Sequence, residues 1–322
     1  AVCKVRSRVR FALTGTPVEN RLGELWSIFS FLMPGYLPPY KSFCSRFEKP
    51  IVQEEDQTAV RRLNQLTGPF ILRRMKSDVL KELPPKTENV YRIELEEEQR
   101  KLYLAAVVDA REKLQAAKPE DKMAVFAVLM RLREICCDPR LIADNWEGGS
   151  AKLDACVELV SSAVEGGHRI LLFSQFTSML ELLAKRLDAE GISHFTLQGS
   201  TPKPVRAELV RRFNGGEVSV FLISLRAGGT GLNLTAADIV IHYDPWWNVA
   251  AQNQATDRAY RIGQQNPVQV YKLIAQDTIE EKIVELQQAK QSLADTVTGT
   301  ADGAILSMRP DELLQLLEGS EP

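Results

Sequence analysis

From residue 151 onward, short apolar runs alternate with amphipathic stretches, and this alternation constrains the fold more than any other feature of the sequence. Apolar runs of strand length occur at 169–173, 194–197, 218–224, 238–243 and 268–274. Stretches with helical periodicity lie between or after them, at 152–164, 179–187, 201–213 and beyond Asp277. Strands that alternate with helices predict a parallel sheet with right-handed crossovers, covered by helices on its faces. We therefore predict an α/β fold with a parallel sheet flanked by helices.

Three of these helices have a sequence signal for their first turn. Ser178 with Glu181 has the spacing of a capping box, as has Asp277 with Glu280 in the last helix. Thr201 can cap the helix whose first residue would be a proline. These signals predict where each helix begins.

An added helical region is predicted upstream of the alternating part. Helices are expected at 96–115 and 122–136, after a strand at 91–95, and earlier helical stretches occur at 57–66 and before Pro34. One apolar stripe in the second of these helices contains Val125, Leu129, Leu132 and Cys136. This i, i+4, i+7, i+11 spacing predicts that the stripe packs into a core.

Polar loops follow three of the predicted strands, after residues 173, 224 and 243. Ligands of parallel α/β sheets bind beyond the carboxyl ends of the strands, so we expect these loops at one edge of the domain. The second loop contains Gly228–Gly231, whose backbone N–H groups could bind an anion. A lone glycine cluster is more often a plain tight turn.

Two arginines follow the third loop. On a helix, Arg258 and Arg261 would share one face because they lie three residues apart. Arginine suits phosphate because its planar fork donates two hydrogen bonds and stays charged. A solvated basic surface is the commoner fate of such a pair. The glycine loop, the Trp246–Trp247 pair and the arginine pair lie on consecutive elements, and together they favour a phosphate-binding site.

Charge and cysteine content exclude several classes of protein. A formal net charge of −2 argues against a uniformly basic nucleic-acid binder but leaves room for a local phosphate-binding groove. Five cysteines, odd in number and without C-x-x-C spacing, predict no zinc site and a reducing compartment. We expect neither a membrane span nor secretion.

The order and spacing of these blocks resemble the Swi/Snf-type ATP-dependent DNA translocases of helicase superfamily two. The matching blocks are Leu13–Pro17, Glu19–Trp26, Ser174–Thr177, Gln198–Thr201, Arg226–Leu234 and Gln254–Gln264. The resemblance implies a RecA-like sheet and five segments. They are the end of a first RecA-like lobe at 1–33, a linker and helical segment at 34–94, a helical insertion at 95–148, the helicase C-terminal lobe at 149–291, and a tail at 292–322.

The resemblance also implies a role for each site residue. Arg258 and Arg261 resemble the arginine fingers that one lobe offers to the γ-phosphate held by the other, and they are the catalytic candidates. The candidates near ATP are Gly231, Asn233, Gln254 and Asp257. The DNA-binding candidates are Ser174, Gln175, Gly199, Ser200, Ser224, Arg226 and Trp247. A buried aromatic is the competing interpretation of Trp247.

The chain departs from the family pattern at two positions. Tyr260 stands where the family commonly has histidine, and Val249 stands where it has proline. Tyr260 lies between the two arginines, so the first departure bears on local packing more than on phosphate chemistry.

The sequence contains no G-x-x-x-x-G-K-[ST] loop, and its Asp311–Glu312 pair follows Pro310 rather than an apolar strand. We therefore expect the C-terminal half of a double-stranded DNA translocase that hydrolyses ATP negligibly by itself. ATP with Mg²⁺ would be bound mainly by the first lobe. The implied partners are duplex DNA, the first RecA-like lobe of the same protein, and nucleoprotein or polymerase complexes. The implied location is the nucleoid or the nucleus. An RNA helicase lobe and a non-catalytic docking module are the alternatives.

Overall fold

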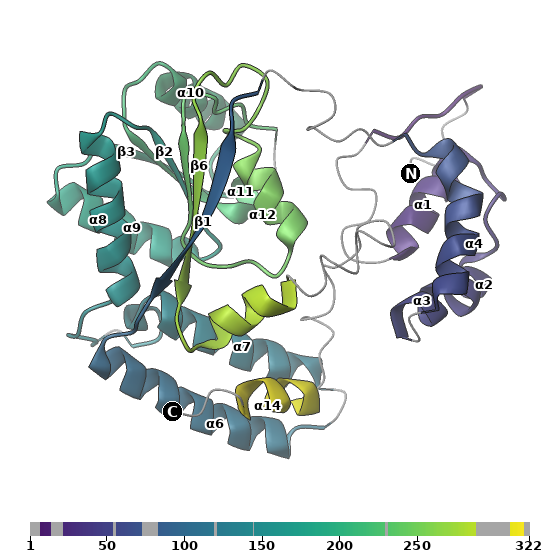
Figure 1. The fold of residues 1–322 in the computed structure, drawn as a ribbon, viewed down its shortest axis with the longest axis horizontal. Coiled ribbons are helices and arrows are strands. Elements are labelled where there is room, and N and C mark those ends of the chain that lie inside the picture. Colours follow the sequence, from purple (N-terminus) through teal and green to yellow (C-terminus); the bar gives the residue numbers. More distant parts are fainter. Residues whose placement is uncertain are drawn as a thin grey trace. The chain divides into compact units, whose positions relative to one another are not determined.

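The computed structural model describes residues 7–13, 22–53, 56–72, 83–118, 121–143, 145–228, 231–287 and 310–318. These residues belong to two compact units, one that reaches residue 72 and one that begins at residue 83 (Figure 1). The Thr14–Pro17 block and the tail other than 310–318 lie outside the described residues. Among the helices described, none is both long and apolar enough to cross a membrane.

The first unit is helical. Its elements are α1 (Leu22–Leu32), α2 (Tyr40–Phe43), η2 (Cys44–Glu48), α3 (Lys49–Gln53), α4 (Gln57–Thr67) and η3 (Gly68–Phe70). Leu25 and Phe29 of α1 pack with Phe43, Phe47 and Leu63 to form its core. The side chain of Asp56 caps α4 by accepting a hydrogen bond from the backbone N–H of Thr58 at 2.8 Å.

The second unit contains a six-stranded sheet in which neighbouring strands pair in parallel. The strands are β1 (Lys86–Ile93), β2 (Ile170–Ser174), β3 (His194–Leu197), β4 (Val220–Ser224), β5 (Ile239–His242) and β6 (Val268–Ala275). Their order is β1-β6-β5-β2-β4-β3. The sheet confirms the predicted RecA-like α/β fold.

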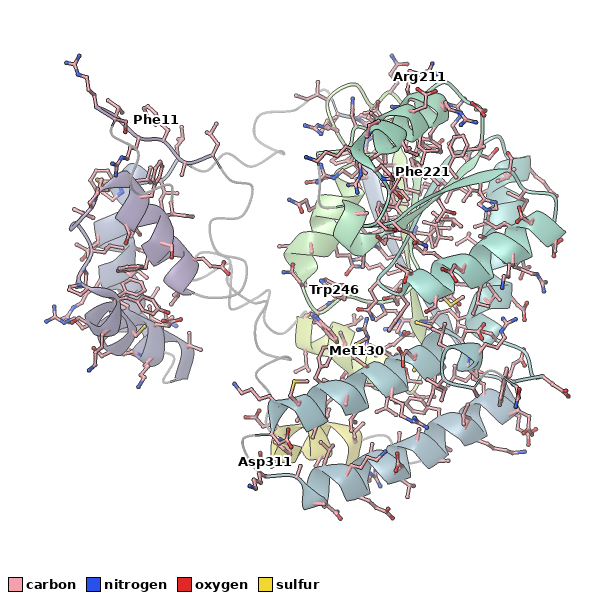
Figure 2. All side chains as sticks on the ribbon, turned by 180° about the vertical axis from the view of Figure 1, so that it is seen from behind. Phe11, Met130, Arg211, Phe221, Trp246 and Asp311 are labelled. Carbon is pink, nitrogen blue, oxygen red and sulfur yellow. The ribbon has the colours of Figure 1, made fainter. Side chains whose placement is uncertain are left out.

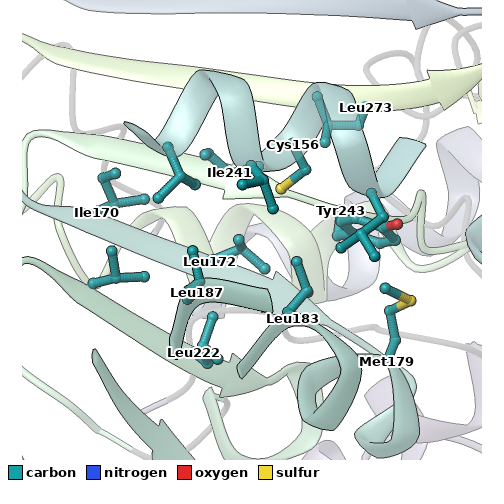
Figure 3. Packing of buried hydrophobic residues seen from close by; sticks show 14 of the residues in the cluster. Cys156, Ile170, Leu172, Met179, Leu183, Leu187, Leu222, Ile241, Tyr243 and Leu273 are labelled. Atoms are coloured by element: carbon teal, nitrogen blue, oxygen red, sulfur yellow. The ribbon is translucent and has the colours of Figure 1, made fainter. Parts of the chain in front are cut away.

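Helices cover both faces of the sheet because successive strand residues point to opposite faces. Ile170, Leu172 and Leu222 pack under α8 (Ala151–Glu165) and α9 (Thr177–Ala189), as Figure 3 shows. Leu171 and Phe221 point the other way, into a second core. The helices that contribute residues to this core are α10 (Lys203–Asn214), α11 (Leu225–Gly228) directly after β4, and α12 (Val249–Thr256). Helices on the two faces bury β2, β4 and β5 completely, which explains the continuous apolar sequences of these three strands.

The strand β1 begins earlier than predicted. It runs from Lys86 rather than from Tyr91 and pairs with β6 along its full length. Seven of its eight residues are exposed, so it is an edge strand without the apolar alternation that marks a half-buried one. The prediction therefore found only its last, more apolar residues.

The added helical region packs on the same unit. It consists of α6 (Glu97–Ala116), α7 (Lys122–Cys137), η4 (Pro139–Leu141), α14 (Pro310–Glu318) and a helix over 279–287. The predicted stripe of Val125, Leu129, Leu132 and Cys136 is buried, which confirms it as core. Figure 1 shows α14 beside α6 and α7, and its Leu313 and Leu317 are fully buried there.

The predicted first-turn signals are wrong in detail. The helix α9 begins at Thr177, and Phe176 precedes it without a side-chain cap, so Ser178 lies inside the helix. Thr201 instead accepts a hydrogen bond from the N–H of Gln198 at 3.1 Å.

The last helix also starts differently. The hydroxyl of Thr278 accepts from the N–H of Glu280 at 3.2 Å, while Asp277 adopts a left-handed backbone with φ of 55°. Thr201 therefore bonds the preceding loop and Glu280 pairs with the buried Lys152, so neither side chain caps its helix as expected.

Candidate functional site

The carboxyl ends of β2 and β5 are joined by the side chain of Asp244. Its Oδ1 atom accepts hydrogen bonds from Ser174 Oγ at 2.6 Å and from the N–H of Gln175 at 3.2 Å. After β4, the N–H of Ala227 donates to Ser224 Oγ at 3.4 Å. Because the strands are parallel, the three loops lie at one edge of the sheet, as predicted.

Asp244 is fully buried, and its charge is met by Arg133 of α7. Arg133 Nη2 lies 3.3 Å from Asp244 Oδ2, both side chains are 0% exposed, and the same nitrogen donates to the carbonyl of Pro245. The guanidinium also lies over the ring of Trp247, 4.4 Å from its centroid. Burial raises the pKa of Asp244, whereas the charge of Arg133 and the hydrogen bond from Ser174 act to lower it.

Three of the candidate DNA-binding residues are buried. Ser174 is 0% exposed, Ser224 is 3% exposed and Trp247 is 6% exposed. Both serine oxygens already have protein partners: Ser174 Oγ donates to Asp244 and accepts from the N–H of Phe176, and Ser224 Oγ accepts from the N–H of Ala227. Trp247 packs with its neighbour Trp246, which lies near Met130 in Figure 2. A DNA contact of these three residues stays a prediction.

The other candidates for DNA contact are more accessible. Gln175 is half-buried, and Gly199 and Ser200 are exposed in the turn after β3. The side chain of Arg226 lies outside the described residues. The turn after β3 is therefore the more accessible part of this edge, since the Nε2 atom of Gln175 is buried and its N–H donates to Asp244.

The arginine pair lies on a turn and not on a helix. The helix α12 ends at Thr256, so the prediction that Arg258 and Arg261 share a helix face is wrong. The N–H of Leu234 donates to the carbonyl of Arg258 at 3.0 Å, and Arg261 Nη1 donates to the carbonyl of Leu232 at 3.4 Å. These bonds place the turn against the segment that directly follows the glycine loop.

Gln264 fixes the end of the turn over residues 257–263, the arginine turn. It is 6% exposed, and its Nε2 atom donates to the carbonyls of Ala237 at 2.7 Å and Ala259 at 3.1 Å. Its Oε1 atom accepts from the N–H groups of Gln265 and Asn266, each at 2.9 Å. The side chain thus ties the turn to the chain that enters β5.

Two like charges lie close together on this turn. Burial lowers the pKa of Arg258, the charge of Arg261 lowers it further, and Asp257 acts in the opposite direction. Arg258 is 7% exposed, whereas Arg261 is exposed. Two adjacent guanidinium groups favour an anion between or beside them.

Among the ATP candidates, Gly231 and Asn233 are exposed and Gln254 is half-buried.

Sequence reasoning missed the buried charges. Besides Arg133, Lys152 forms an ion pair with Glu280 in which both side chains are 0% exposed. Glu280 also accepts a hydrogen bond from the N–H of Ala275 at 2.9 Å. A signal existed for Arg133, because it follows Leu129 by four residues and precedes Cys136 by three, which places it on the apolar stripe.

His242, the last residue of β5, is neutral and buried. It is 1% exposed, and its Nε2 atom lies 2.9 Å from Thr256 Oγ1. Because that hydroxyl donates to the carbonyl of Gln252 at 3.3 Å, it accepts from Nε2, and Nδ1 is the unprotonated atom. Among the described residues, Nδ1 has no hydrogen-bond partner. Burial lowers the pKa of His242 to about 3.

We expect His242 to make the chain less stable as the pH falls from 6.5 towards 3. In that range the unfolded state binds a proton that the folded state does not, so the free energy of unfolding decreases by at most ~1.4 kcal/mol per pH unit. His242→Gln retains a donor towards Thr256 but does not titrate. Urea unfolding at pH 7 and pH 4.5 should show a loss about 2 kcal/mol smaller in the variant than in the wild type. An equal loss in both proteins would exclude this role.

The second unit is a RecA-like lobe whose arginine turn lies against residues 232–234, directly after the glycine loop. The family model described as "SNF2-related domain" matches residues 1–141, and "Helicase conserved C-terminal domain" matches residues 151–263. The SWI2/SNF2 ATPase core of Sulfolobus solfataricus, solved in complex with dsDNA, is 34% identical with a TM-score of 0.63. That match covers 98% of this chain and 68% of the solved one.

Curated relatives extend the likeness to bacteria and animals. An ATP-dependent helicase of Mycoplasma genitalium is 39% identical over 99% of this chain and 31% of its own length. The mouse SWI/SNF-related matrix-associated actin-dependent regulator of chromatin subfamily A member 1 is 37% identical over 98% of this chain and 32% of its own. The chain belongs to the SWI/SNF family of ATP-dependent helicases. It spans about a third of the length of the curated relatives that it matches.

Proposed function

We propose that this chain is the C-terminal half of an ATP-dependent translocase or remodeller that acts on double-stranded DNA. In this proposal, Arg258 and Arg261 act on ATP bound by a first RecA-like lobe, and the chain alone hydrolyses ATP negligibly. The observation that carries the proposal is the arginine turn, which hydrogen bonds hold beside the segment following the glycine loop.

The two arginines would act electrostatically on the substrate. An arginine that reaches a transferring phosphoryl group stabilises the charge that develops on its oxygens. Arg261 is exposed and can reach outward, while Arg258 lies deeper and helps to fix the turn. Gly231, Asn233, Gln254 and Asp257 would surround the nucleotide, with Mg²⁺ held mainly by the first lobe. When the two lobes close around ATP, the turn would complete the site.

DNA contact would come from the edge of the sheet. Gln175, Gly199, Ser200 and Arg226 are the residues proposed to face the DNA backbone, since N–H groups and polar side chains at strand ends donate to phosphate oxygens. Ser174, Ser224 and Trp247 would act by holding these loops in place. Each cycle of closing and opening would then move the two lobes along the duplex.

We expect this chain to bind duplex DNA with an affinity that falls as the salt concentration rises. Each neutralised phosphate contributes about −0.9 to the slope of log K against log salt, so three contacts give a slope of roughly −3. Titration of a labelled duplex between low and physiological salt would measure it. Binding that is absent at low salt would favour a docking module, and a strong preference for RNA would favour an RNA helicase lobe.

A further inference from the structure

One buried cation, Arg133, joins the helical region to the sheet edge. It projects from α7 and meets the segment after β5 at Asp244, Pro245 and Trp247. Asp244 in turn accepts hydrogen bonds from Ser174 Oγ and from the N–H of Gln175. A continuous chain of polar contacts therefore runs from α7 to the ends of both β5 and β2.

Stability alone does not account for a charge at this place. The side chain of Arg133 is 0% exposed, and its Nε and Nη1 atoms have no hydrogen-bond acceptor among the described residues. Aromatic rings surround the guanidinium instead: its central carbon lies 4.4 Å from the ring centroid of Trp247 and 5.6 Å from that of Phe176. Apolar residues of similar size often replace a buried ion pair without loss of stability. The feature that only arginine provides is geometric, because its plane can stack on a ring while its edge donates to two acceptors.

We propose that Arg133 is a positioning residue that holds the segment 244–248 and the end of β2 in one fixed arrangement. It would couple the helical region to the edge of the sheet that faces duplex DNA. This inference rests on the proposed function only for the identity of the ligand. Because Trp247 lies beneath the guanidinium, this arrangement would give a buried tryptophan an indirect role in binding at this edge.

Three variants separate positioning from general stability. Arg133→Lys keeps the charge but loses the planar fork. The pair Arg133→Met with Asp244→Asn removes both charges, while the amide can still accept from Ser174 and Gln175. Arg131→Lys is the matched control, since Arg131 is exposed on the same helix. The double variant keeps the test available if Arg133→Lys does not fold.

The first readout is hydrogen exchange of this chain, followed by mass spectrometry. In both Arg133 variants we expect about tenfold faster exchange in peptides covering 173–176 and 243–249, which is the effect of losing one hydrogen bond to a charged group. Peptides from α8 and β3 should exchange as in the wild type, and Arg131→Lys should change nothing. Unchanged exchange at 243–249 would overturn the proposal. So would faster exchange spread evenly over the unit, because that result indicates only a loss of stability.

The second readout is the affinity for a labelled DNA duplex at low salt. Because the bound arrangement would lose the contribution of about one such hydrogen bond, we expect the apparent Kd to rise by up to about tenfold. Local loosening without weaker binding would overturn the link between Arg133 and DNA. If the wild-type chain binds no duplex, the proposed function fails, and the exchange result still decides whether Arg133 positions the segment.

Discussion

Arg261→Ala, introduced into a protein in which this chain is joined to a first RecA-like lobe, is expected to lower DNA-stimulated ATP turnover by about 10³-fold or more while ATP still binds. The loss is large because the guanidinium would act on charge that develops during phosphoryl transfer, and not on the bound substrate. The effect on folding should be small, since Arg261 is exposed and the hydrogen bond from its side chain to Leu232 is long at 3.4 Å. Steady-state turnover and nucleotide binding, measured on the same preparation, would separate the two effects.

Two comparisons make this result specific. Arg211→Ala removes an exposed arginine of α10 that pairs with Glu208, and it should leave turnover unchanged. Arg258→Ala should reduce turnover and also destabilise the turn, because Arg258 is mostly buried. Turnover of the Arg261 variant within a few-fold of the wild type would remove the arginine turn from the mechanism.

The alternation of apolar and amphipathic segments was sufficient to predict the sheet, because buried parallel strands need continuous apolar runs. It also placed the polar loops after β2, β4 and β5 at one edge, since that follows from parallel pairing alone. The strand β1 was found only in part because an exposed edge strand carries little apolar pattern. Helix starts failed for a related reason: Thr201 and Glu280 had hydrogen-bond partners outside their own first turns.

The candidate site was predicted less completely than the fold. Arg258 and Arg261 were identified, but their helix ends at Thr256, and only contacts with residues 232–234 reveal where the turn lies. Buried charges were missed because their partners are remote in sequence. Arg133 and Asp244 are 111 residues apart, and no local spacing rule joins them.

The second buried pair is expected to control the stability of the whole unit. Lys152 of α8 and Glu280 of the 279–287 helix are both 0% exposed, and Lys152 also lies over the ring of Tyr243 at 5.6 Å. Lys152→Ala would leave the carboxylate of Glu280 buried without its cation, at a cost of about 3–5 kcal/mol in the free energy of unfolding. Urea unfolding followed by circular dichroism would measure that loss.

A paired variant distinguishes the cost of an orphaned charge from the value of the pair. Lys152→Met with Glu280→Gln removes both charges, and the amide oxygen can still accept from the N–H of Ala275, so we expect stability within about 1 kcal/mol of the wild type. Lys185→Ala, at an exposed position of α9, should change it by no more than ~0.5 kcal/mol. If the single variant behaved like this surface control, Glu280 would have to be solvated or protonated at neutral pH, and the helix over 279–287 would not depend on the ion pair. If instead the paired variant lost as much as the single one, the attraction between the two ions would itself be what fixes that helix against α8.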